Sequence, residues 1–263
     1  MDGLDKHSIA LFLNNAELER KEVTRITAQY PDLSVEEAYL IQDELVKQKL
    51  ADGHKIVGPK MGLTSQAKMK QMNVEEPIYG YVFDYMIVPN GGEIFLDELI
   101  HPKVEAEVAF ILGKDLEGPN VTAEQVMEAT SYIVPALEII DSRYENFRFT
   151  LPDVIADNTS ASRVVFGDRL LKPSGLEADL IGVTMLFNGE IKALGASAAV
   201  LGHPANSIAM LANMLARKGG KLHAGEVILS GGITEAIMFS SGDYVTVKFD
   251  GLGEVSFVVK EKK

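Results

Sequence analysis

The stretch VEAEVAFIL, from Val104 to Leu112, decides the fold class. Its apolar residues recur at 104, 106, 108 and 110, which is the two-residue period of a β-strand. That period places Glu105 and Glu107 together on the opposite face of the strand. The stretch therefore predicts a strand near the middle of the chain, with one apolar face and one acidic face.

Short β-rich runs broken by glycines surround this strand from Lys55 to the C-terminus. We expect strands at 55–61, interrupted at Gly58-Pro59, at 133–140, broken by Pro135, and at 227–229, 244–249 and 254–259. Helices are expected at 122–129 and 204–217. Because helices and strands do not alternate regularly, the pattern favours an α+β fold with a mixed sheet over a doubly wound sheet.

The first 55 or so residues are typical of helices. Ser34 and Glu37 form a capping box, and the helix that follows is expected to end near Gly53. The sequence thus predicts an N-terminal helical segment over residues 1–54 and a mixed-β catalytic body over residues 55–263.

Composition excludes several classes of protein. The chain has 263 residues, 46% of them hydrophobic and 24% charged, which is ordinary for a globular domain. Lys and Arg number 25 against 38 Asp and Glu, and the net charge of −13 argues against nucleic acid and anionic membranes as partners. The absence of cysteine excludes thiolate chemistry. The acidic N-terminus lacks the features of a secretory signal, so we expect a soluble, cytoplasmic protein.

Three glutamates are candidates for a metal site. Glu105 and Glu107 lie about 6–7 Å apart along the strand, so they repel each other unless a cation intervenes. Glu138 lies in the apolar run 135–140, where a lone charge is costly. Oxygen ligands of this kind suit Mg²⁺ or Mn²⁺. A solvated acidic face for the first two, and a salt bridge from Glu138 to Arg143, remain open as alternatives.

Lys60 is a single lysine within an apolar, glycine-rich strand. Desolvation would suit it to proton transfer or to polarising a carbonyl, while a lysine that reaches solvent from a strand end is the alternative. The cluster 157–160 offers closely spaced hydrogen-bond donors and acceptors, and the backbone amides of the glycine loop 230–234 could contact a carboxylate; plain turns are the alternative for both. The sequence contains no Ser/His/Asp arrangement, P-loop or dinucleotide-binding fingerprint.

Several segments together resemble the hydratase/decarboxylase group of the fumarylacetoacetate hydrolase superfamily. They are KIVGPKMGLTS (55–65), PIYG (77–80), HPKVEAEVAF (101–110), PALEIIDSRYENF (135–147), ADNTSASR (156–163), LGHP (201–204) and the glycine loop at 230–232. The resemblance covers nearly the whole chain and implies a mixed, barrel-like β-roll with an N-terminal helical segment.

The resemblance also implies the site. A divalent metal, Mg²⁺ or Mn²⁺, would be held by Glu105, Glu107 and Glu138. Lys60 would act on the 2-oxo group of the substrate, and Ser160 would contact a substrate carboxylate. Further candidates for substrate contacts are Asp157, Arg143 and Thr234.

The activity implied is decarboxylation of 2-oxo-3-hexenedioate to 2-hydroxy-2,4-pentadienoate and CO₂. The loop 141–147 and the apolar Ile78 favour it over the alternative, hydration of 2-hydroxypentadienoate, because Ile78 replaces a candidate acid/base for activating water. A homo-oligomer and a complex with the hydratase of the next step are expected. A non-catalytic role as a subunit of that complex stays open.

Overall fold

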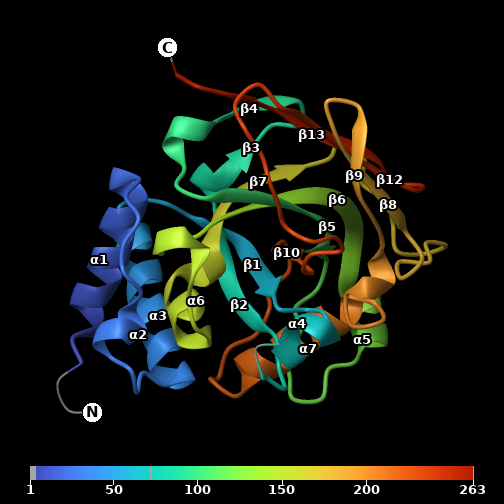
Figure 1. The fold of residues 1–263 in the computed structure, drawn as a ribbon. Helices are drawn as coiled ribbons and strands as arrows, with labels where there is room; N and C mark the ends of the chain where they lie inside the picture. Colours follow the sequence, from blue (N-terminus) through green and yellow to red (C-terminus); the bar gives the residue numbers. More distant parts are fainter. Residues whose placement is uncertain (1–3, 72, 263) are drawn as a thin grey trace.

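Two sheets form the body of the protein, which a computed structural model describes over residues 4–71 and 73–262 (Figure 1). The strands of the larger sheet are, in spatial order, β2 (Ile78–Phe83), β1 (Ile56–Gly62), β10 (Val227–Leu229), β5 (Pro102–Leu112), β6 (Thr130–Asp141), β7 (Ala161–Phe166) and β3 (Ile87–Val88), with β11 (Ile237–Met238) also paired to β5. The strands of the smaller sheet are β4 (Gly92–Phe95), β13 (Gly253–Lys260), β12 (Tyr244–Phe249), β8 (Gly182–Phe187) and β9 (Glu190–Ala196).

Both sheets are mixed. The pairs β1–β10, β3–β7 and β4–β13 are parallel, and the remaining pairs are antiparallel. The prediction of an α+β fold with a curled, mixed-β body is confirmed.

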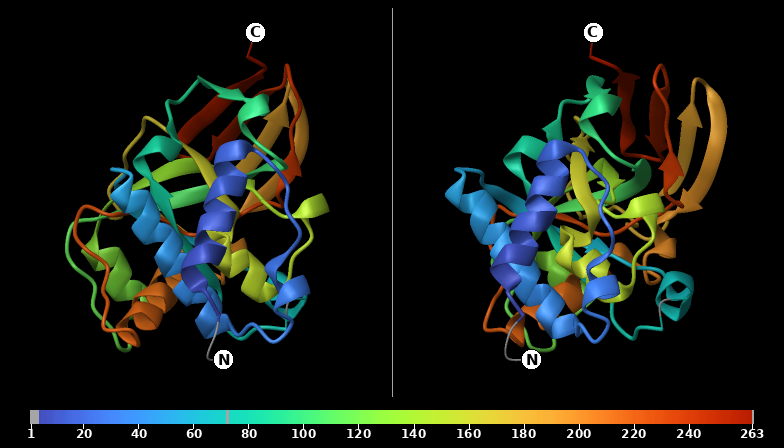
Figure 2. Two further views of the ribbon diagram at one scale, coloured as in Figure 1. Left: turned by 90° about the vertical axis from the view of Figure 1, so that its left-hand side faces the viewer. Right: turned by 60° about the vertical axis from the view of Figure 1, so that its left-hand side comes forward.

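The helices divide into two groups. The first comprises α1 (Lys6–Glu19), α2 (Ile26–Gln29), α3 (Val35–Ala51) and α6 (Leu151–Ala156), and the second α4 (Gln66–Gln71), α5 (Ala123–Ala129) and α7 (Pro204–Ala216). Within them, α3 packs against α1 and α6, and α7 packs against α5 and β1. Figure 2 shows the N-terminal helices on one side of the body, with the smaller sheet and the C-terminus at the end away from the N-terminus.

Helix α3 follows the sequence prediction closely. The Ser34 hydroxyl accepts a hydrogen bond from the Glu37 amide, the Glu37 carboxylate accepts one from Ser34, and Gly53 follows the helix end with φ +94°. Its buried residues Ile41 and Leu45 belong to a hydrophobic cluster that also contains many of the buried residues of the strands. The predicted boundary at 54/55 falls between the end of α3 and the start of β1.

Two predicted interruptions are wrong. β1 runs through Gly58-Pro59 without a break. Its pairing with β2 is irregular instead at a register shift between Ile56 and Gly58. β6 runs through Pro135, whose carbonyl accepts a hydrogen bond from the Gly167 amide just beyond the end of β7. The N–H that Pro135 lacks would face the same region beyond the end of β7, so its absence removes no hydrogen bond between strands.

Candidate active site

The register of β5 against β6 assembles the three glutamates. Glu105 lies directly opposite Glu138, and Glu107 follows two residues later on the same face. One carboxylate oxygen from each residue lies within 4.8 Å of the others. Glu105, Glu107 and Glu138 are 8%, 0% and 0% exposed, so the alternative of a solvated acidic face is wrong.

The electrostatics of this cluster fit a divalent cation. Burial, and then the charge of Glu138, raise the pKa of Glu107 well above its usual range. Burial also raises the pKa of Glu138, against the opposing charge of Lys60. Among the described residues, Glu107 Oε1 and Glu138 Oε2 are buried without a hydrogen-bond partner. Carboxylate oxygens that converge without enough positive charge are the donor set that Mg²⁺ and Mn²⁺ prefer.

Lys60 lies beside this cluster. On β1 it pairs with Gly80 of β2 and Leu229 of β10, and it is 2% exposed. Its Nζ lies 3.0 Å from Glu138 Oε1 and donates a hydrogen bond of 3.2 Å to the Thr159 carbonyl. Burial excludes a lysine that reaches solvent. Glu138 thus pairs with Lys60 and not with Arg143.

The Thr159 carbonyl belongs to a turn of unusual backbone geometry. Asn158, Thr159 and Ser160 have φ angles of +48°, +50° and +58°. Each left-handed residue other than glycine costs about 1 kcal/mol or more, so the surroundings must impose this conformation. Ser160 Oγ is buried and has no hydrogen-bond partner within the described part of the chain. This hydroxyl is therefore available to a ligand.

Strand β2 supports one side of the turn. The Asn158 side chain accepts a hydrogen bond from the Tyr81 amide at 2.8 Å and donates one to the Tyr81 carbonyl at 2.9 Å. The turn also approaches Gly80 so closely that a Cβ there would lie 2.4 Å from Thr159 Oγ1. Gly80, opposite Lys60 in the register, thus makes room for the turn.

The glycine loop after β10 does present an amide to a carboxylate, but to one of the protein's own. The Gly231 amide donates a hydrogen bond of 2.8 Å to Glu107 Oε2. A Cβ at Gly232 would lie 2.9 Å from the Glu105 carboxylate carbon. Close to this loop, Thr234 Oγ1 accepts a hydrogen bond of 3.2 Å from the Ala106 amide. The loop therefore holds in place the segment of β5 that contains the two glutamates.

Arg143 and Asp157 lie outside the glutamate cluster and bond to each other. Arg143 Nε donates to Asp157 Oδ1 at 2.5 Å, and the two residues are 1% and 0% exposed. Burial raises the pKa of Asp157 to about 7, and the Arg143 guanidinium opposes this shift. Asp157 is the first residue of the 157–160 turn, and the Arg143 guanidinium bonds to the backbone at both ends of that turn.

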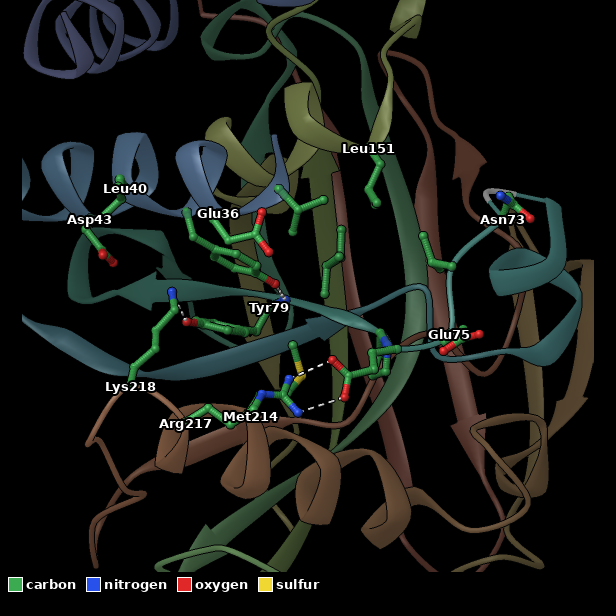
Figure 3. A pocket seen from close by; sticks show the side chains of 16 residues that line it. Glu36, Leu40, Asp43, Asn73, Glu75, Tyr79, Leu151, Met214, Arg217 and Lys218 are labelled. Carbon is green, nitrogen blue, oxygen red and sulfur yellow. Dashed lines mark hydrogen bonds and ion pairs between the residues drawn. The ribbon is translucent and has the colours of Figure 1, made fainter. Parts of the chain in front are cut away.

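A pocket of about 880 Å³ lies between α3, α6 and the end of α7 (Figure 3), and its described lining includes none of Lys60, Ser160 and the three glutamates. Its cations have partners: Arg217 pairs with Glu76, and Lys218 donates a hydrogen bond of 3.1 Å to the Tyr79 hydroxyl. Ile78 also lines the pocket. Because Ile78 lies opposite Gly62, two residues from Lys60, its side chain belongs to the Lys60 face of the sheet.

Sequence reasoning missed the Thr159 carbonyl, which accepts a hydrogen bond from Lys60 although its residue type indicates no such role. It did expect an amide of the glycine loop to meet a carboxylate, but not that this carboxylate would be Glu107. The one available signal was glycine next to chemistry-bearing residues, at Gly80, Gly231 and Gly232.

The chain belongs to the fumarylacetoacetate (FAA) hydrolase C-terminal family, whose sequence profile matches residues 51–260. Among its relatives, a 4-oxalocrotonate decarboxylase from Pseudomonas sp. (strain CF600) is 48% identical over 95% of this chain and 94% of its own. A 2-oxo-hept-4-ene-1,7-dioate hydratase from Escherichia coli is 40% identical, over 96% and 98%. The structure of 4-oxalocrotonate decarboxylase from Pseudomonas putida G7, complexed with magnesium and adipate, matches with a TM-score of 0.96 and 45% identity over 98% of both chains.

None of the described helices combines the length and the apolar character that a membrane span requires.

Proposed function

We propose that this protein is a metal-dependent decarboxylase that converts 2-oxo-3-hexenedioate (4-oxalocrotonate) to 2-hydroxy-2,4-pentadienoate and CO₂. The observation that carries the proposal is the buried triad Glu105, Glu107 and Glu138 beside Lys60, in which Glu107 Oε1 and Glu138 Oε2 have no hydrogen-bond partner among the described residues. The 48% identity to a decarboxylase over nearly the whole chain supports this substrate over others that a metal triad could serve.

The three glutamates would hold Mg²⁺ or Mn²⁺. When bound, the cation would supply Lewis-acid stabilisation for negative charge that develops on the 2-oxo oxygen. It would also give this acidic protein the local positive charge that a dicarboxylate substrate requires.

Lys60 has a clear task in the reaction. The C5–C6 bond breaks to release CO₂, its electron pair forms the C4–C5 double bond, the double bond moves from C3–C4 to C2–C3, and charge reaches the 2-oxo oxygen. Lys60 Nζ, held by Glu138 and the Thr159 carbonyl, would donate a proton or a hydrogen bond to that oxygen. The reaction thus begins with a dianion and ends with a hydroxydiene and CO₂.

Other side chains would bind and orient the substrate. The unpartnered Ser160 hydroxyl would donate a hydrogen bond to a substrate carboxylate. Ile78 would give the departing carboxylate an apolar surround, which favours neutral CO₂ over the anion. Thr234 bonds to the Ala106 amide, and a contact from its side chain to the substrate stays a prediction.

The test is a spectrophotometric assay with 2-oxo-3-hexenedioate, with and without Mg²⁺, combined with detection of CO₂. Metal-dependent substrate loss with release of CO₂ is expected. Hydration of 2-hydroxypentadienoate without CO₂ release would instead assign the chain to the hydratases, and activity on neither substrate would reject both assignments.

We also propose that the protein forms homo-oligomers, associates with the hydratase that consumes its product, and works in the cytoplasm. Ile191 and Leu194, on the edge strand β9, are 61% and 69% exposed, which supports an interface there. Sedimentation velocity of the protein alone and with that hydratase tests both associations.

A further inference from the structure

We propose that Arg143 is a positioning residue of the active site: it clamps the 157–160 turn that carries the Thr159 carbonyl to Lys60 and presents the Ser160 hydroxyl. This inference rests on the proposed function for its kinetic consequences. Its structural content, a turn held in a left-handed conformation by one buried guanidinium, can be tested without any substrate.

The hydrogen bonds of Arg143 bridge the two ends of the turn. Nη2 donates to the Asp157 carbonyl at 2.7 Å, where the turn begins, and Nη1 donates to the Ala161 carbonyl at 3.2 Å, where it ends. Nη1 also donates to the Asp141 carbonyl at 2.7 Å, at the end of β6. One rigid fork therefore joins both ends of the turn to the strand that carries Glu138.

Asp157 completes the clamp. Its two carboxylate oxygens accept hydrogen bonds from Arg143 Nε at 2.5 Å and from the Arg143 amide at 3.3 Å. Its carbonyl accepts a second bond, from the Ser160 amide at 2.9 Å, which closes the turn on itself. With both residues essentially inaccessible, these bonds are made without competition from water.

The opposite side of the turn is held independently by β2. Asn158 bonds to both polar backbone groups of Tyr81, and Gly80 leaves space for Thr159. The turn is thus fixed between Arg143 and β2, and its Thr159 carbonyl accepts a hydrogen bond from Lys60. Asn158 anchors the turn to β2, whereas Arg143 fixes the distance between the two ends of the turn.

Arg143 makes none of its described hydrogen bonds with the three glutamates. Loss of the clamp should therefore disturb the placement of Thr159 and Ser160 while the metal triad on β5 and β6 stays in place. An error of about 1 Å in the placement of such groups costs about a hundredfold in rate.

The variant Arg143→Lys keeps the charge and removes the fork, and Arg148→Lys, at an exposed position on the same loop, is its matched control. Hydrogen–deuterium exchange is measured first. We expect faster amide exchange at 157–161 in Arg143→Lys, with exchange in β5 and β6 and the affinity for Mn²⁺ unchanged within about threefold. Arg148→Lys should match the wild type in every measurement.

The kinetic measurement uses the double variant Arg143→Lys/Ser160→Ala. Arg143→Lys alone should lower kcat by about tenfold to a hundredfold, and by a smaller factor when Ser160 is already alanine, because part of its effect acts through the Ser160 hydroxyl and the rest through the Thr159 carbonyl on Lys60. Multiplicative effects would show that Arg143 does not position Ser160 and would overturn that part of the proposal.

Two further results would also overturn it: unchanged exchange at 157–161, or faster exchange throughout the sheet with loss of Mn²⁺ binding. Should Arg143→Lys fail to fold, Asp157→Asn, which removes one charged acceptor of the clamp, is judged by the same exchange criteria. Inactivity of the wild type on 2-oxo-3-hexenedioate would reject the proposed function, while the exchange measurement would still decide the role of Arg143.

Discussion

The Thr159 carbonyl oxygen lies 3.2 Å from Lys60 Nζ and accepts its hydrogen bond, although the two residues are 99 positions apart in the chain. Lys60 also forms an ion pair with Glu138, so the ammonium group is bound by one charged and one neutral acceptor. This arrangement aims the lysine without consuming all three of its protons, and one N–H remains for the substrate oxygen.

Lys60→Ala should lower kcat by about 10²- to 10⁴-fold, the range for loss of a general acid, and should leave Mn²⁺ affinity intact or higher, because a cation next to the glutamates is removed. Steady-state kinetics and calorimetric Mn²⁺ titration measure the two effects. Lys55→Ala, at an exposed position before the same strand, is the control. Loss of Mn²⁺ binding in Lys60→Ala would reassign Lys60 to structure.

Glu107→Gln should weaken Mg²⁺ binding by about a hundredfold or more, because even residues that only support metal ligands typically contribute 10–100-fold. The same change should raise the Tm of the metal-free protein at neutral pH, since it removes a carboxyl group that burial and the charge of Glu138 make costly to ionise. Exposed Glu128→Gln serves as control. Unchanged Mg²⁺ affinity would rule out Glu107 as a ligand.

Stability of the metal-free protein should fall as pH rises above about 4.5. Burial raises the folded-state pKa of Glu107 and of Glu138, and repulsion adds to the shift, from Glu138 on Glu107 and from Glu105 on Glu138, so the folded protein retains protons that the unfolded chain has lost. Each group then lowers the free energy of unfolding by up to about 1.4 kcal/mol per pH unit until its folded pKa is passed. Mg²⁺ should therefore raise Tm more at pH 8 than at pH 5. An equal Mg²⁺ effect at both pH values would contradict this linkage.

Gly232→Ala should weaken metal binding although it adds only a methyl group. The new Cβ would lie 2.9–3.0 Å from the Glu105 carboxylate atoms, so that carboxylate must move. Gly220→Ala meets its nearest atom at 3.5 Å and should be neutral. Mn²⁺ titration of the two variants decides the point, and equal affinities would show that Glu105 is not held in place by this contact.

Ile78→Asp should lower decarboxylation by at least about tenfold, because a hydrated side chain on the Lys60 face would bring water to the substrate carboxylate and stabilise the anion against loss of CO₂. Ile78→Leu preserves the apolar surface and should retain most activity. CO₂ release at saturating substrate measures both. Full activity of Ile78→Asp would remove Ile78 from the reaction and with it one argument against the hydratase.

The acidic face of β5 could be predicted from the sequence because the two-residue period of a strand can be recognised within one segment, without knowing which strand pairs with it. The proximity of Glu138 could not, since it depends on the alignment of β6 with β5. The same holds for Lys60, whose acceptors lie on β6 and on the 157–160 turn. Sequence reasoning wrongly placed breaks at Pro59 and Pro135. A proline interrupts a strand only where its missing N–H would have bonded to a neighbouring strand, and the sequence does not show which strand lies there.

The direct opposition of Glu105 and Glu138 makes metal affinity a reporter of strand alignment. A shift of β6 by one residue would bring Leu137 or Ile139 opposite Glu105 and turn Glu138 to the other face of the sheet. Insertions or deletions in the connection 113–129 can therefore abolish metal binding without changing any ligand. Conversely, a redesigned connection that preserves affinity has preserved the alignment, so a simple titration can screen libraries for it.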